Sequence, residues 1–206
     1  MNKQTVLKMC SWGLAVIVLA LALGVWAHNR LAFGGLTTYK LFPILGLSAF
    51  SLMWTHYIVG ALRRILKQDK KVVKLYSSVT GAVVLALILF HPGLLWYQLW
   101  RDGLGLPPKS YLHAYPSTGM HIALMLGSIS LLIFLAFELK HHFEKKSWWK
   151  LVDYAQIAAM FFIFYHALTL GQEVAHGWFR VVWYFYGLSL LAAVVYNYAY
   201  DRKPAK

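Results

Sequence analysis

The chain has 206 residues, of which 60% are hydrophobic and only 13% are charged. One core of a soluble domain of this length cannot hide so much apolar surface, so the composition excludes an ordinary soluble enzyme and indicates surrounding lipid. The net charge of +13 would favour nucleic-acid binding in a soluble protein. Here the basic residues lie in short segments beside apolar runs, where they set membrane topology, and no nucleic-acid partner is expected.

Six apolar runs follow one another along the chain, separated by short polar or basic segments. Each run is close to the roughly 20 residues that an α-helix needs to cross the hydrocarbon core of a bilayer. The runs cover residues 9–27, 41–62, 72–100, 117–137, 151–170 and 178–198. No gap between them is long enough for another domain, and the sequence shows no internal repeat. We therefore expect residues 1–206 to form a single membrane domain, an all-α bundle of six transmembrane helices.

The first run also resembles a signal peptide, because Lys3 and Lys8 give it a basic start and a cleavage site could follow near Ala27. A retained helix is the preferred interpretation. The run is longer than the apolar region of a usual signal peptide, and its removal would leave the two ends of the chain on opposite faces, against the basic residues found at both ends.

The distribution of lysine and arginine predicts the orientation of the bundle. With a cytoplasmic N-terminus, 15 of the 20 basic residues lie inside and 5 lie outside. The inside set is Lys3, Lys8, Arg63, Arg64, Lys67, Lys70, Lys71, Lys74, Lys140, Lys145, Lys146, Lys150, Arg202, Lys203 and Lys206, and the outside set is Arg30, Lys40, Arg101, Lys109 and Arg180. This bias predicts a multi-pass protein of the inner (plasma) membrane with both termini cytoplasmic and the lipid bilayer as its partner.

Histidines within the apolar runs are the first candidates for function, because ionisable side chains in hydrocarbon are costly. His91 lies 17 residues after Lys74, and His166 lies 16 residues after Lys150. At 1.5 Å per residue, both rings lie roughly 25 Å along helices that start from the same face. The sequence therefore places these two imidazoles at matching depth, in the outer half of the bilayer.

Two imidazoles at one depth on co-directional helices can bind a single haem iron from opposite sides. Each ring then needs a hydrogen bond from its other nitrogen, and the carbonyl oxygens of Leu87 and Phe162, one turn back, are the expected acceptors. The alternative is a pair of histidines that merely hydrogen-bond between helices. Pro92, directly after His91, predicts a kinked or loosened helix at that point.

Two further histidines lie inside the runs, His56 and His121. His56 lies some 15 residues into the second run from the outer face and His121 only about four into the fourth, a difference in depth of roughly 16 Å. One haem cannot bridge that difference, so this pair is not expected to bind one.

Residues 75–99 (LYSSVTGAVVLALILFHPGLLWYQL) and 137–170 (FELKHHFEKKSWWKLVDYAQIAAMFFIFYHALTL) carry a likeness to a known family. Over roughly residues 41–197 the chain resembles the ferric reductase-like transmembrane domain. Its size and layout are similar to those of the haem-binding membrane subunits that serve periplasmic methionine sulfoxide reductases. The resemblance implies a haem b protein in which the third and fifth helices supply paired histidines, with His91 and His166 as the outer pair.

The chain departs from the family at the inner pair of ligands. Those positions fall near Ser77 and Asp153, neither of which is a usual haem ligand, so the resemblance implies one haem rather than two. A flavin or quinone on the inner side could take the place of the second haem, with Asp153 as a contact. Asp153 is also explained as a solvated carboxylate in the first turn of its helix, where acidic residues are favoured.

Further polar residues are expected at the outer mouth of the bundle, among them His121 and Glu173. Arg101 and Arg180 are candidates for binding haem propionates, and His121 for meeting an acceptor. The alternative is that these residues are interfacial anchors.

The resemblance implies an oxidoreductase component that passes electrons from a cytoplasmic-side donor to an extracytoplasmic acceptor or partner protein. Because the chain contains no nucleotide-binding domain, the donor would be a flavin, a separate reductase or a quinol. Two alternatives stay open. One is a non-redox membrane scaffold or partner subunit that keeps the fold without a cofactor, and the other is a haem-based sensor.

Overall fold

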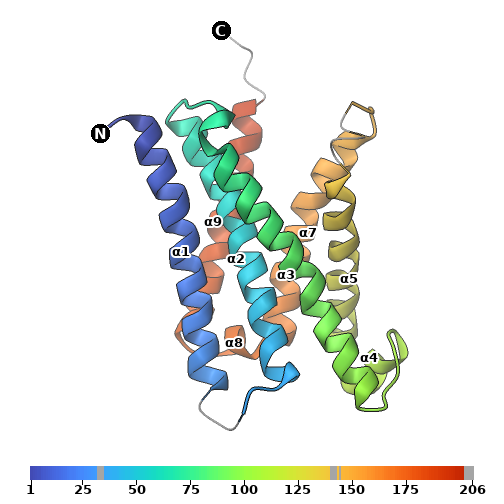
Figure 1. The fold of residues 1–206 in the computed structure, drawn as a ribbon. Helices are drawn as coiled ribbons and strands as arrows, with labels where there is room; N and C mark the ends of the chain where they lie inside the picture. The colour runs from blue at the N-terminus through green and yellow to red at the C-terminus, as the bar shows by residue number, and fades with distance from the viewer. Residues whose placement is uncertain (32–34, 140–142, 144, 202–206) are drawn as a thin grey trace.

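The structure is a computed structural model that describes residues 1–31, 35–139, 143 and 145–201, and these residues form helices without any strand (Figure 1). The long helices are α1 (Lys3–Arg30), α2 (Thr38–Ile65), α3 (Lys74–Arg101), α5 (Thr118–Glu138), α7 (Trp149–Leu170) and α9 (Trp178–Asp201). The short ones are η1 (Lys70–Val73), α4 (Lys109–Ala114) and α8 (Gln172–Ala175). The predicted all-α architecture with six long apolar helices is confirmed.

Each long helix is sufficient in length and composition to cross a membrane. The shortest, α5, has 21 residues, which at 1.5 Å per residue gives roughly 32 Å, slightly more than the hydrocarbon core of a typical bilayer. The chain therefore has the make-up of a multi-pass membrane protein.

Local signals fix several helix ends. The side chains of Asn2 and Ser117 accept hydrogen bonds from backbone N–H groups in the first turns of α1 and α5, and Asp69 does the same at η1. Gly103 follows α3 and Gly177 precedes α9, and both have a φ near +77°, a left-handed conformation that glycine adopts without steric cost.

Successive long helices run in opposite directions, so the start of α1, the turn from α2 through η1 to α3 and the end of α9 lie at the same end of the bundle (Figure 1). We call this the basic end, because most of the basic residues predicted to lie inside are found there. Of the residues considered above, Lys140, His141, His142, Arg202, Lys203 and Lys206 lie outside the described part of the chain.

Helix α2 is the centre of the packing and is flanked by α1, α3 and α9. Its Phe50 and Trp54 pack on Trp183 and Tyr186 of α9, with ring centres 4.4 and 4.5 Å apart in the Phe50–Trp183 and Trp54–Tyr186 pairs. Helix α5 packs mainly on α7. Phe164 of α7 stacks on Trp183 with 6.0 Å between the ring centres. This contact joins the α5–α7 hairpin to the rest of the bundle.

Large apolar side chains cover the outside of the helices. Leu75, Leu151, Val181 and Leu188 are each 70–72% exposed in the isolated chain. Apolar surface of this extent needs lipid or another protein to cover it, so the exposed faces fit the expected lipid bilayer.

Candidate functional site

His91 and His166 come together in the bundle. His91 is on α3 and His166 on α7, and each lies 17 residues after the first residue of its helix, Lys74 and Trp149 respectively. Their ring centres are 6.5 Å apart, and the ring planes are inclined at 80°. The matching depth predicted from the sequence is thus confirmed, although the two histidines are 75 positions apart in the chain (166 − 91).

A backbone carbonyl anchors each imidazole through Nδ1. The Nδ1 of His91 lies 2.7 Å from the carbonyl oxygen of Phe42 on α2, and the Nδ1 of His166 lies 2.8 Å from that of Ala123 on α5. Because a carbonyl oxygen can only accept, Nδ1–H donates in both bonds and the neutral ring keeps its lone pair on Nε2. This is the tautomer that binds a metal through Nε2 while the other nitrogen orients the ring.

The prediction that the carbonyl oxygens of Leu87 and Phe162 accept these two hydrogen bonds is wrong. Within an α-helix, the carbonyl four residues back already accepts the backbone N–H of the histidine itself. Each ring instead reaches sideways to the preceding long helix. Spacing along the sequence predicts contacts within one helix, whereas the orienting hydrogen bonds run between helices.

Glycines provide the room for the two rings. A Cβ added at Gly46 would lie 2.8 Å from Cε1 of His91, and one added at Gly127 would lie 2.6 Å from Nδ1 of His166. Real side chains do not approach so closely, so only glycine allows the backbones of α2 and α5 to lie against the imidazoles.

The hairpins α2–α3 and α5–α7 therefore build the site in the same way. Each glycine lies four residues after the anchoring carbonyl, Gly46 after Phe42 and Gly127 after Ala123, which places both groups on one helix face. The hairpins share this spacing rather than a run of similar residues, so the sequence shows no internal repeat.

The ring pair suits a metal held between two nitrogen donors. Metal–imidazole bonds of roughly 2 Å, with about 1.1 Å from each nitrogen to its ring centre, would separate the ring centres by roughly 6.2 Å, close to the 6.5 Å found. The described residues contain no group of three or more His, Cys, Asp or Glu side chains that could bind a metal by themselves. Two imidazoles are too few for a protein-only zinc site, but they are what haem needs as axial ligands.

Pro92 does not interrupt α3, which is helical from Lys74 to Arg101. A proline at this point lacks the N–H that would bond to the carbonyl one turn back. The helix nevertheless continues beyond His91, so the predicted loosening does not extend to a break.

His56 and His121 take no part in the ring pair among the contacts of the described residues. His56 Nε2 donates to Thr80 Oγ1 at 2.7 Å, because the Thr80 hydroxyl itself donates to the carbonyl of Tyr76. This bond joins α2 to α3 nearer the basic end. In the described part of the chain, the buried Nε2 of His121 has no hydrogen-bond partner.

Arg101 and Arg180, the predicted propionate ligands, have other surroundings. Arg101 is exposed at the end of α3, ten residues and therefore roughly 15 Å beyond His91. Arg180 donates to the carbonyl of Ala175 at 2.9 Å and to the hydroxyl of Tyr184 at 3.1 Å. No contact in the described residues brings either arginine to the ring pair.

Glu173 is not an open residue of the outer mouth but is buried, with 1% of its side chain exposed. Its Oε1 lies 2.5 Å from Nε of Arg30, which ties α8 to the end of α1. This ion pair belongs to the packing of the end opposite the basic end.

Ser77 and Asp153 are the positions near which the resemblance to the ferric reductase-like domain implies inner ligands. Ser77, in the first turn of α3, lines a pocket together with His56. Asp153 is exposed on α7 and accepts a hydrogen bond from Trp149 Nε1 at 3.2 Å. Neither residue supplies a nitrogen or sulfur ligand for haem, as the sequence indicates.

Tyr111, within α4, and Tyr115, directly after it, lie at the end opposite the basic end. Burial raises the pKa of Tyr111 and of Tyr115. Both phenols therefore stay neutral and act as hydrogen-bonding groups rather than as charges, and the Tyr111 hydroxyl bonds with the indole of Trp96.

Comparisons with protein-family models, with curated proteins and with solved structures found no match to this chain. Membership of the ferric reductase-like family therefore stays a prediction. It depends on the likeness of residues 75–99 and 137–170 to that family.

Proposed function

We propose that this chain is a haem b-containing transmembrane electron-transfer protein of the ferric reductase-like kind, with His91 and His166 as the axial ligands. The observation that carries the proposal is the pair of neighbouring imidazoles, 6.5 Å apart at their centres, each oriented by a carbonyl on Nδ1. Bound haem would supply one-electron chemistry, because its iron alternates between the ferric and ferrous states.

The chain's own groups would bind and orient the haem. The carbonyls of Phe42 and Ala123 keep each ring in the tautomer with Nε2 free and raise the basicity of that nitrogen. Partly buried apolar residues of α3 and α7, among them Ile88 and Ile163, lie close in helical spacing to the two histidines. They would exclude water from the site and lower its dielectric constant, which tunes the reduction potential of a haem.

Electrons would enter at the basic end, facing the cytoplasm, and leave at the opposite end to an extracytoplasmic acceptor. His91 lies 17 residues, roughly 25 Å, from the start of α3 but only ten residues from its end. The site is therefore nearer the acceptor side. A flavin or quinone on the inner side, for which Asp153 is the candidate contact, would carry electrons across the longer stretch from a reductase or quinol.

The test is a reduced-minus-oxidised absorption spectrum of the purified full-length protein, with haem quantified per chain. We expect one haem b per chain in the wild type and loss of the spectrum in His91→Ala and His166→Ala. His56→Ala is the matched control, because His56 is also a histidine of the bundle but bonds to Thr80; it should keep its haem.

A colourless protein made under haem-replete conditions would overturn the proposal and leave a membrane scaffold without cofactor. If haem is present, menadiol or a flavin reductase should reduce it and an external acceptor should reoxidise it. Haem that binds but passes no electrons would identify a sensor instead of a conduit.

A further inference from the structure

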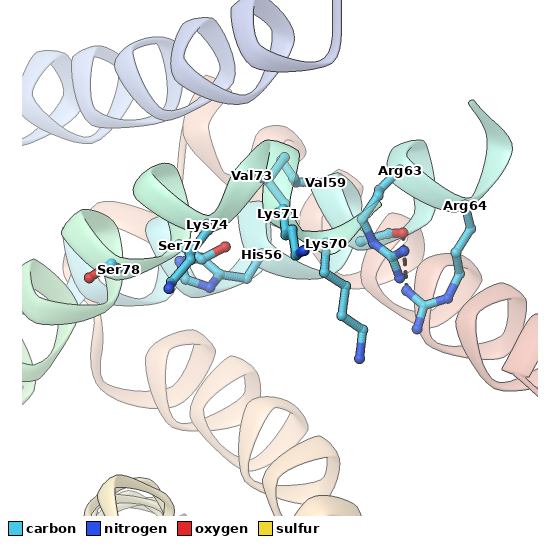
Figure 2. Close-up of a pocket in the computed structure, with 11 residues that line it drawn as sticks. His56, Val59, Arg63, Arg64, Lys70, Lys71, Val73, Lys74, Ser77 and Ser78 are labelled. Atoms are coloured by element: carbon cyan, nitrogen blue, oxygen red, sulfur yellow. Dashed lines mark hydrogen bonds between the residues drawn. The ribbon is translucent and has the colours of Figure 1, made fainter. Parts of the chain in front are cut away.

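A pocket of about 590 Å³ lies at the basic end, between the end of α2, η1 and the first turns of α3 (Figure 2). Its lining includes five cationic side chains and no carboxylate. The five are Arg63, Arg64, Lys70, Lys71 and Lys74. An adjoining pocket of about 770 Å³ shares four of these residues and adds Lys67 and the carboxylate of Asp69. Two neighbouring pockets thus concentrate six positive charges around the turn between α2 and α3.

These charges are only partly balanced by the protein itself. Arg64 pairs with Asp201 at 2.5 Å, and the Asp69 carboxylate accepts from the backbone N–H of Lys71 at 2.7 Å. Within the described part of the chain, Lys70, Lys71 and Lys74 form no ion pair. Cations so close together repel one another, so an anion in the pocket would relieve an unfavourable arrangement.

The remaining lining is suited to a phosphate attached to an apolar body. Figure 2 shows the side chains of Arg63, Arg64 and Lys70 extending in the same direction, with His56, Ser77 and Ser78 at the other end of the lining. Lysine, arginine and serine donate to phosphate oxygens. Val59 and Val73 add an apolar part to the lining.

We propose that this pocket binds the headgroup of an anionic phospholipid. Leu75 and Val79, 70% and 42% exposed, lie on α3 close to the lining residues Lys74 and Ser78. Acyl chains could therefore cover this part of α3 while the phosphate is held in the pocket, which a soluble phosphate compound would not do. Basic pockets between transmembrane helices are recognised sites for cardiolipin and phosphoinositide headgroups.

The need for basic residues to set topology does not account for their convergence in one pocket. A second basic cluster, Lys145, Lys146 and Lys150, lies before and at the start of α7 and is fully on the surface. None of its three lysines lines either pocket. Topology requires only positive charge beside the helices, and this second cluster supplies that charge without lining either of these two pockets.

The experiment is a lipid titration of the purified full-length protein in neutral detergent, followed by native mass spectrometry. The probes are cardiolipin, phosphatidylglycerol and phosphatidylcholine, with inorganic phosphate and ATP as soluble competitors. The test variant is Lys70→Gln/Lys71→Gln/Lys74→Gln, and the matched control is Lys145→Gln/Lys146→Gln/Lys150→Gln, which removes the same charge from the second cluster. A Lys70→Arg/Lys71→Arg/Lys74→Arg variant keeps the charge and guards against a loss caused by misfolding.

We expect cardiolipin and phosphatidylglycerol to bind the wild type more tightly than phosphatidylcholine does. The test variant should lose roughly 100-fold in affinity for cardiolipin, while the control and the arginine variant stay within about threefold of the wild type. If the test and control variants lose cardiolipin affinity equally, the binding depends only on general surface charge, and the proposal is overturned. Binding of ATP or phosphate in preference to lipid would overturn the lipid assignment. None of these outcomes depends on haem.

Discussion

Gly46 of α2 lies directly against the imidazole of His91 of α3, so that a Cβ at this glycine would fall 2.8, 3.0 and 3.1 Å from three of the ring atoms. The same ring donates to the carbonyl of Phe42, one turn earlier on α2. One helix face thus both makes room for the histidine and orients it.

Gly46→Ala should displace the His91 ring from this face and weaken its hydrogen bond to Phe42. Loss of an orienting contact around a metal ligand costs roughly 10- to 100-fold in metal affinity, so we expect a loss of haem affinity of that size. Gly127→Ala should behave likewise through His166, because the two hairpins build the site in the same way. Haem titration of the purified apo-proteins measures both effects.

Gly81→Ala serves as the control for these glycine variants. Gly81 is also inside α3, but a Cβ there would meet nothing within 4 Å. Alanine should leave haem affinity unchanged and stabilise the helix by about 0.5–1 kcal/mol. If Gly46→Ala and Gly127→Ala bind haem as well as Gly81→Ala does, the close approach of glycine and imidazole has no part in binding.

The Arg30–Glu173 ion pair should contribute strongly to stability. Glu173→Gln leaves the Arg30 guanidinium without its carboxylate in a site where Arg30 is 20% and Glu173 1% exposed. Breaking a buried pair from one side costs about 3–5 kcal/mol. Thermal unfolding of the purified protein, followed by circular dichroism, should show a clear fall in Tm.

The comparison for this prediction is Asp201→Asn, which breaks the Arg64–Asp201 pair near the basic end. Asp201 is 59% exposed, and such a pair contributes only about 0–1 kcal/mol because water screens it. A Tm that falls as far in Asp201→Asn as in Glu173→Gln would show that burial does not decide the contribution of these pairs.

Reporter fusions should find both ends of the chain in the cytoplasm. Green fluorescent protein fused to either end should fluoresce, and alkaline phosphatase should be active only when it is inserted between α1 and α2, between α3 and α5 or between α7 and α9. The reason is that the basic residues concentrate at the end of the bundle where α1 begins and α9 ends (Figure 1). Active phosphatase at the two ends of the chain would invert the assigned orientation.

Much of the fold could be predicted because its causes are local. Hydrophobic runs long enough for a bilayer specify helices wherever they occur, and the six predicted runs correspond to α1, α2, α3, α5, α7 and α9. Counting residues along α3 and α7 also placed His91 and His166 at one depth, since the rise per residue of a helix is constant.

Only the tertiary structure decided what lies beside each histidine. The sideways contacts to Phe42 and Ala123, the two glycines and the bond from His56 to Thr80 all depend on how neighbouring helices are rotated and paired. In a membrane bundle that choice comes from close packing and interhelical hydrogen bonds, because lipid is as apolar as the side chains that face it. The sequence by itself determined the spans and the depth of the two histidines, and helix packing determined that their ring centres lie 6.5 Å apart.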